Sequence, residues 1–156
     1  MLLSKACIYG IRASLFMAAM HKQNRQFVPI REVSHGLGLS FHFLTKILQQ
    51  LTAAGLMESY KGPNGGITLT REPKEIMLIE IVTAIDGDAL FTQCVLGLPG
   101  CGHKKPCPLH DKWAYTRDAI QIMFNSTSLE EMANKGKRMN LRLSDELTME
   151  DLIKSV

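Results

Sequence analysis

The stretch Ile30-Arg-Glu-Val-Ser-His-Gly-Leu-Gly-Leu-Ser-Phe-His-Phe-Leu-Thr-Lys-Ile-Leu-Gln-Gln-Leu51 decides the fold of this chain. It contains two short segments with helical periodicity, and Gly36 and Gly38 interrupt the periodicity between them. Pro29 is suited to the start of the first helix, and Ser40 can cap the second. Two short helices around a glycine-containing turn form the helix-turn-helix pattern, so we predict helices over residues 30–37 and 40–54.

The second of these helices has two chemically different faces. Leucine and isoleucine recur on one side at the spacing of a buried helix face. The opposite side carries His42, Thr45, Lys46 and Gln49, which supply hydrogen-bonding groups and one positive charge without any carboxylate. Such a face suits the major groove of DNA, where base edges are recognised by hydrogen bonds and phosphates attract cations. A solvated helix face is the alternative interpretation.

A β-hairpin is predicted directly after this helix. Residues 57–61 and 67–69 have strand character, and Gly62-Pro-Asn-Gly-Gly66 between them is a turn that requires positive φ. A hairpin in this position is a wing, whose glycine backbone can approach phosphates or the minor groove closely. The candidate DNA-contacting residues are therefore Ser40, Phe41, His42, Thr45, Lys46, Gln49, Lys61, Asn64, Gly65 and Gly66.

Three further helices are predicted over residues 4–22, 77–86 and 108–125. In the last of them an apolar stripe repeats nearly every heptad, and the chain offers few remaining elements to cover it. We expect the same helix of a second subunit to cover it, giving a two-fold dimer with its recognition helices about one DNA turn apart. The candidate dimerisation residues are Leu109, Trp113, Ile120 and Phe124.

The loop before this helix holds three of the chain's four cysteines, spaced Cys94-x6-Cys101-x5-Cys107-x2-His110. Dense glycine and proline keep the loop out of regular structure, so it can wrap its donors around one metal centre. The spacing lacks the short Cys-x2-Cys knuckles of zinc ribbons, and longer gaps suit a bulkier iron–sulfur cluster. A redox-active thiol set, such as a Cys101–Cys107 disulfide, and inert cysteines are the alternatives. His110 and His103 are rival fourth ligands.

Composition restricts the function further. The chain has 156 residues, and residues 1–75 carry nine Lys/Arg against four Asp/Glu, whereas the remainder carries nine against eleven. The basic half is therefore the candidate for a polyanionic partner. Neither a membrane-spanning run nor a signal peptide is evident, so we expect no membrane partner and a cytoplasmic location, where clustered cysteines more often mean metal or redox work. Paired carboxylates, nucleophile elbows and phosphate loops are missing, so we expect no enzyme.

These observations predict a mainly α fold with a small β-hairpin wing, in which a winged helix-turn-helix domain is followed by a long dimerisation helix. The expected domains are 1–87 for DNA binding, 88–107 for a cysteine-rich sensor loop, 108–134 for the dimerisation helix and a short following helix, and 135–156 for a polar C-terminal tail. We expect this tail to be mobile, with a weak helix near residues 148–153.

Taken together, several motifs resemble the IscR/NsrR family of winged-helix regulators, also called the Rrf2 superfamily. They are the helix-turn-helix, Lys61-Gly-Pro-Asn-Gly-Gly66, the segment 75–87, and the cysteine loop ending Cys107-Pro-Leu-His-Asp-Lys-Trp113. The resemblance covers about residues 1–130. It implies a homodimeric transcription factor, in most cases a repressor, that binds double-stranded DNA at a palindromic operator. Many members of this family sense iron–sulfur status, nitric oxide or redox state through a cluster.

The resemblance also implies a ligand set. By position, Cys94, Cys101 and Cys107 match the family's cysteine ligands, and His110 matches the histidine of IscR-like members, which hold a 2Fe–2S cluster. Ile8 stands where NsrR-like members have an acidic ligand, which favours the IscR-like set. The expected function is a repressor whose operator affinity responds to this cluster. A cluster-free regulator that senses redox state through its thiols, and a zinc-bound structural loop, are the alternatives.

Overall fold

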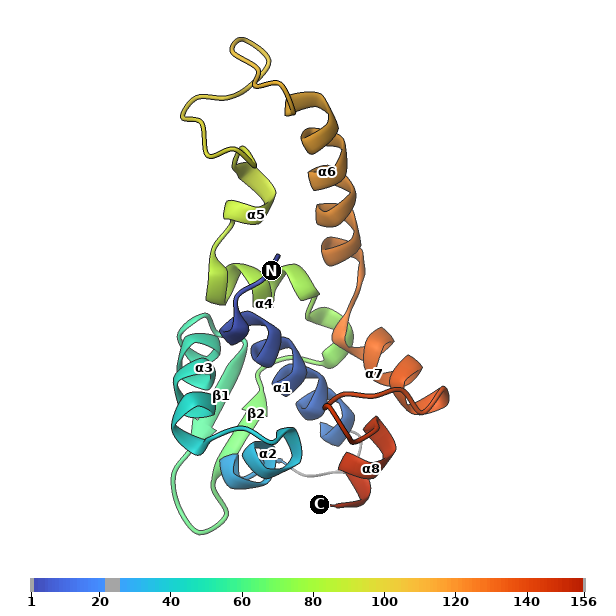
Figure 1. Ribbon diagram of the computed structural model, residues 1–156. Coiled ribbons are helices and arrows are strands. Elements are labelled where there is room, and N and C mark those ends of the chain that lie inside the picture. The colour runs from blue at the N-terminus through green and yellow to red at the C-terminus, as the bar shows by residue number, and fades with distance from the viewer. Residues whose placement is uncertain (1, 22–25, 156) are drawn as a thin grey trace.

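A computed structural model of the chain describes residues 2–21 and 26–155, so the predicted end of the first helix at Lys22 lies outside the described residues. Helices and one hairpin make up the fold (Figure 1). In chain order the elements are α1 Lys5–His21, α2 Ile30–Leu37, α3 Phe41–Ala53, β1 Met57–Tyr60, β2 Gly66–Leu69, the 3-10 turn η1 Pro73–Glu75, α4 Leu78–Asp86, α5 Ala89–Thr92, α6 His110–Ser126, α7 Leu129–Arg138 and α8 Met149–Lys154.

Helix α1 forms the centre of the core. Every residue from Ala13 to Met20 is buried, and Cys7 has no exposed surface, as its place on the apolar stripe predicts. The Ser14 hydroxyl is also buried there and donates to the Gly10 carbonyl at 2.8 Å. Because α1 is apolar on most sides, it needs neighbours all around it. Helices α3, α4, α7 and α8 contact it, with α3 and the hairpin on one side and α7 and α8 on the other (Figure 1).

The helix-turn-helix has the predicted form. The Ser40 side chain accepts a hydrogen bond from the Phe43 amide at 3.2 Å and so caps α3. Gly38 ends α2 at φ 63°, a left-handed conformation that favours glycine. The apolar face of α3 is fully buried, and its members are Leu44, Ile47, Leu48 and Leu51.

The predicted wing is also present. Strands β1 and β2 pair antiparallel, with Met57 opposite Leu69 and Tyr60 opposite Gly66. Val28 bridges Ile67 on the other side of β2 and ties the start of the helix-turn-helix to the wing. A Cβ at Gly66 would collide with the Val28 backbone, so only glycine allows this close approach.

Helix α6 extends away from the main body, and the short α5 lies beside it (Figure 1). Phe124 is only 6% exposed because it packs edge-on against Phe91 of α5, with ring centroids 6.0 Å apart. The Trp113 indole donates to the Gln93 carbonyl at 2.9 Å. The expectation that no element of the same chain covers this stripe was therefore wrong for its inward part, because the four-residue α5 was not visible as a periodic pattern.

The segment expected to be a mobile polar tail instead packs against the core. Helix α7 runs on to Arg138, and the following residues fold back to form α8. Leu143, Met149 and Leu152 are 8%, 3% and 0% exposed, and the Lys137 ammonium donates to the Ala19 carbonyl at 2.9 Å. The helix expected near residues 148–153 is present as α8, but the expected mobility was wrong, because single, widely spaced apolar residues give no periodicity although each of these three is buried. None of the helices in the described part of the chain is long and apolar enough to cross a membrane.

We expect Leu152→Ala to lower the free energy of unfolding by roughly 2–4 kcal/mol, because it leaves a cavity beside Gly36 and Phe16. Urea unfolding followed by circular dichroism measures the loss. Leu147→Ala is the matched control, since that side chain is 37% exposed and should cost under about 1 kcal/mol. Equal losses in the two variants would show that α8 is not docked.

Candidate functional site

The three loop cysteines converge in the structure. Between α5 and α6, the sulfurs of Cys94, Cys101 and Cys107 all lie within 4.8 Å of one another, and the Cys94 and Cys107 sulfurs are 3.6 Å apart. Gly97 and Gly100 adopt φ of 66° and 69°, which lets the chain turn back between the first two cysteines. All four cysteines of the chain are free thiols. The loop therefore presents three soft donors to one point without rearrangement.

A histidine stands beside this cluster. His110 is the first residue of α6, and its Nδ1 lies 3.4 Å from the Cys101 sulfur. The His103 ring packs edge-on against the His110 ring, with 5.5 Å between the two ring centroids. Of the two rival histidines, His110 is thus the one in contact with a cysteine sulfur.

The thiols of the loop differ in acidity from one another and from the buried fourth cysteine. A backbone hydrogen bond from Leu98, helped by one from Leu96, lowers the pKa of Cys94 to about 7 against the opposing effect of desolvation. The backbone of Cys107 favours the Cys101 thiolate, but desolvation and the two adjacent sulfurs outweigh it and raise the pKa of Cys101. Burial, and then the nearby Asp86 carboxylate, raise the pKa of Cys7 to about 12.

These acidities suit metal binding at the loop and not at Cys7. Metals bind thiolates, and one sulfur of the cluster reaches the thiolate form near neutral pH, so binding needs the release of fewer protons. Three sulfurs and one imidazole nitrogen match the donors used for structural zinc and for iron–sulfur clusters. The donor set and its convergence therefore fit either group.

The exposed side of α3 has the polar character that the sequence predicts. Ser40, His42, Lys46 and Gln49 are exposed, whereas Thr45 is half-buried and its hydroxyl donates to the Phe41 carbonyl at 2.7 Å. Phe41 remains 40% exposed, although it is apolar. In the wing, Lys61 and Asn64 are exposed, and Gly65 and Gly66 are half-buried.

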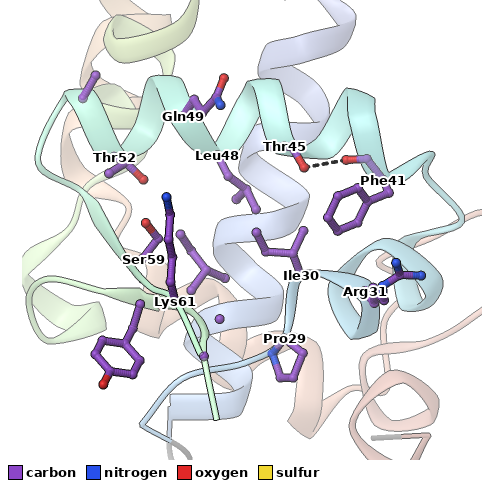
Figure 2. Close-up of a pocket in the computed structure, with 15 residues that line it drawn as sticks. Pro29, Ile30, Arg31, Phe41, Thr45, Leu48, Gln49, Thr52, Ser59 and Lys61 are labelled. Carbon is purple, nitrogen blue, oxygen red and sulfur yellow. Dashed lines mark hydrogen bonds between the residues drawn. The ribbon is translucent and has the colours of Figure 1, made fainter. Parts of the chain in front are cut away.

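Two residues on this side of the molecule were missed by sequence reasoning. The Arg31 guanidinium lies 5.4 Å from the centre of the Phe41 ring, and Tyr60 at the end of β1 is 60% exposed. Together with α3 and the wing they border a groove of about 680 Å³ (Figure 2). Arg31 gave no sequence signal, because its position next to Phe41 depends on the turn between α2 and α3.

The predicted dimerisation residues fall into two groups. Leu109 is 40% exposed, but Trp113 and Ile120 are half-buried and Phe124 is buried against its own chain. The opposite side of α6 exposes Tyr115 and Ile122, which are 80% and 67% exposed, and Met123 on the flank of the helix is 53% exposed.

Comparison with known proteins gives consistent matches. A family model described as Rrf2, iron-dependent transcriptional regulator, matches residues 3–135. The HTH-type transcriptional regulator IscR of Photorhabdus laumondii is 33% identical over 126 residues, which cover 81% of this chain and 75% of that protein. The IscR of Xenorhabdus nematophila is 32% identical over 124 residues, covering 80% and 74%.

Solved structures agree with the predicted fold. CymR, the global cysteine regulator of B. subtilis, superposes with a TM-score of 0.72 at 25% identity, covering 85% of this chain and 96% of that one. The IscR of T. potens gives a TM-score of 0.69 at 23% identity, with coverages of 89% and 90%. The predicted winged-helix fold is thereby confirmed. The matched relatives are transcriptional regulators and not enzymes, as the sequence also predicts.

Proposed function

The chain belongs to the Rrf2 family of transcriptional regulators, and from that premise we propose that it is a homodimeric repressor whose operator affinity responds to a 2Fe–2S cluster on the cysteine loop. The observation that carries the proposal is the convergence of three sulfurs within 4.8 Å, with an imidazole nitrogen 3.4 Å from one of them. The residues that would hold the cluster are Cys94, Cys101, Cys107 and His110.

An iron–sulfur cluster, when bound, supplies one-electron redox chemistry and sensitivity to oxidants. The contribution of the chain is to connect this site to the DNA-binding elements. His110 begins α6, α6 packs on α4, and α4 packs on α3, so a change at the loop reaches α3 through contacting helices. A bound cluster would tie Cys107 and His110, and with them the start of α6, to the other loop cysteines. Without the cluster this connection would be absent. A coupling of about 1–3 kcal/mol, typical of allostery, changes operator affinity roughly 5- to 150-fold.

For DNA binding, we propose that α3 enters the major groove and that the wing approaches the backbone or the minor groove. The proposed contacts remain those on the exposed side of α3 and in the wing, namely Ser40, Phe41, His42, Thr45, Lys46, Gln49, Lys61, Asn64, Gly65 and Gly66. Support comes from the exposure of the polar and cationic members and from the lack of any carboxylate on α3.

For the dimer, we propose that a second copy covers the outward side of α6. Tyr115 and Ile122 stand seven residues apart on one face, opposite Trp113 and Phe124. Apolar side chains exposed in this way along one helix mark an interaction surface, and a two-fold axis would pair the same face of both copies. Leu109 precedes Trp113 by one helical turn and so lies on the inward side, where its 40% exposure lets it contact the second copy at the edge of this interface, while the buried Phe124 would support α6 from within the protomer.

A second candidate function keeps the DNA binding and replaces the cluster with thiol oxidation. It is supported by the 3.6 Å separation of the Cys94 and Cys107 sulfurs, and we therefore propose this pair for the disulfide in place of Cys101–Cys107. In this reaction hydrogen peroxide takes two protons and two electrons from the two thiols, which lose their S–H bonds and form an S–S bond, and the peroxide is itself reduced to two molecules of water.

Anaerobic reconstitution with ferrous iron and sulfide should give visible charge-transfer absorption and about two irons and two sulfides per protomer. Cys101→Ala should remove this absorption, whereas Cys7→Ala should retain it because Cys7 lies outside the donor set. Comparing His110→Ala with His103→Ala identifies the fourth ligand, and the cluster should be lost only in the first. A wild-type protein that stays colourless and holds only zinc would refute the cluster.

Replacing Lys46 or Lys61 with glutamine should weaken DNA binding by a similar factor for all sequences, because each removes one phosphate-neutralising charge. The slope of the logarithm of affinity against the logarithm of salt concentration should fall by about 0.9 per substitution. Fluorescence anisotropy with a labelled duplex measures this slope. Lys74→Gln in η1 is the matched control and should leave it unchanged. Unaltered slopes in the first two variants would contradict phosphate contact by either lysine.

For the second candidate, one equivalent of hydrogen peroxide added to the metal-free protein should reduce its mass by two hydrogens, and peptide mapping should link Cys94 to Cys107. Cys107→Ser should prevent the link, whereas Cys101→Ser should permit it. If the peptides containing Cys101 and Cys107 were joined in the wild type, the pairing favoured by the structure would be incorrect.

A further inference from the structure

The groove between α3 and the wing has the properties of a small-molecule site. Its volume of about 680 Å³ lies within the range of 300–1,000 Å³ that is usual for ligand pockets. Figure 2 shows Leu48 of α3 and Ile30 at the start of α2 lying toward its interior, with Phe41 at one end. These elements come from three different parts of the chain, so the folded structure and not a local motif creates the groove.

The lining of the groove is mainly apolar and carries positive charge at two places. Arg31 flanks Phe41 at one end, with 5.4 Å between the guanidinium and the ring centre. The Lys61 side chain extends from the wing toward Thr52 of α3 (Figure 2). Among the described residues that line the groove there is no carboxylate to neutralise either cation. A neutral ligand would leave these charges unused, whereas an anion with an apolar body complements both features.

Aromatic side chains narrow the class of ligand. Phe41 and Tyr60 line the groove and are 40% and 60% exposed. Burying an aromatic ring against an apolar ligand is favourable, so both rings offer binding energy to a ligand in the groove. The Tyr60 ring is itself supported by the Phe27 ring, at 5.6 Å between centroids. Planar ring systems stack on such side chains with little loss of conformational entropy.

From these observations we propose that the groove between α3 and the wing binds an aromatic carboxylate, with its rings against Phe41 and Tyr60 and its carboxylate near Arg31. The site is distinct from the cysteine loop, which joins α5 to the start of α6 and lies away from α3 and the wing (Figure 1). It would give the protein a second input, independent of the cluster.

A ligand in the groove would compete with DNA. Phe41 and Lys61 border the groove and are also among the proposed DNA contacts. This consequence rests on the proposed DNA-binding function, whereas binding of the ligand to the free protein does not. By linkage, a ligand that weakens DNA binding is itself bound more weakly by the protein–DNA complex, by the same factor.

Isothermal titration of the full-length, anaerobically purified protein with biphenyl-4-carboxylate tests the site without DNA. We expect saturable one-site binding with a Kd of about 0.1–1 mM, the range expected for an unoptimised ligand of this size. The neutral isostere biphenyl-4-carboxamide should bind about 3- to 5-fold more weakly, because its attraction to the cations is lost. No saturation by the carboxylate up to millimolar concentration, or equal affinity for the two compounds, would overturn the proposal.

Two variants locate the binding. Arg31→Met should weaken carboxylate binding about 3- to 5-fold and leave carboxamide binding unchanged, and Tyr60→Ala should weaken both. Lys74→Met, which removes a cation outside the groove, is the matched control and should alter neither. Circular dichroism melts verify folding. Carboxylate binding that persists unchanged in both groove variants would place the ligand elsewhere and refute the site.

The competition is measured with a duplex recovered by in vitro selection on the same protein. At a carboxylate concentration of ten times its Kd, the apparent affinity for this duplex should fall about 10-fold. An unchanged affinity for the duplex, with ligand binding intact, would overturn the competition. Failure of the protein to bind any duplex would instead count against the proposed function.

Discussion

The enclosure of α1 is the constraint on which the remaining structure depends. This helix is apolar on nearly all sides, and from Ala13 to Met20 it has no surface that can face water without cost. The helix-turn-helix covers one side, α4 a second, and α7 with α8 the rest. The elements that carry the proposed DNA contacts are therefore rigidly mounted on the same helix that holds the C-terminal segment. A packing change on one side of α1 therefore shifts the elements on its other side, because close-packed interiors have low compressibility and transmit strain.

The candidate metal centre depends on a different kind of constraint. The loop between α5 and α6 takes its shape from glycines that allow left-handed turns, and the Trp113 indole of α6 donates to the Gln93 carbonyl just before the loop. The two thiols differ in acidity: a backbone hydrogen bond from Leu98 lowers the pKa of Cys94, whereas desolvation and the two adjacent sulfurs outweigh the backbone hydrogen bond from Cys107 and raise the pKa of Cys101. An arrangement of this kind is well suited to a bound group that can be gained and lost, since none of the three sulfurs belongs to the hydrophobic core.

The proposed DNA-binding side and the groove share residues, and this overlap connects two aspects of the molecule. Phe41 and Tyr60 are large apolar side chains that remain exposed on this side. Polar and cationic side chains alone could bind nucleic acid, so DNA binding does not by itself account for these two rings. Arg31 gives this side a cation from α2 that lies outside both the recognition helix and the wing. The groove thus gives these exposed apolar groups a physical role, whether the occupant is part of a duplex or a small anion.

Much of the fold could be predicted from the sequence, because the helix-turn-helix, its cap and the wing depend on residues that are close together in the chain. Ser40 caps α3, Gly38 ends α2, and the apolar side of α3 is buried as its periodicity predicts. The cysteine spacing likewise indicated the candidate metal centre. The tertiary structure alone decided that Phe91 covers Phe124, that Leu143, Met149 and Leu152 dock the C-terminal segment, and that Arg31 lies beside Phe41. Each of these depends on single side chains far apart in the chain or on the angle of a turn. Such contacts leave no periodic trace, because a residue's local neighbours do not determine which distant surface it meets.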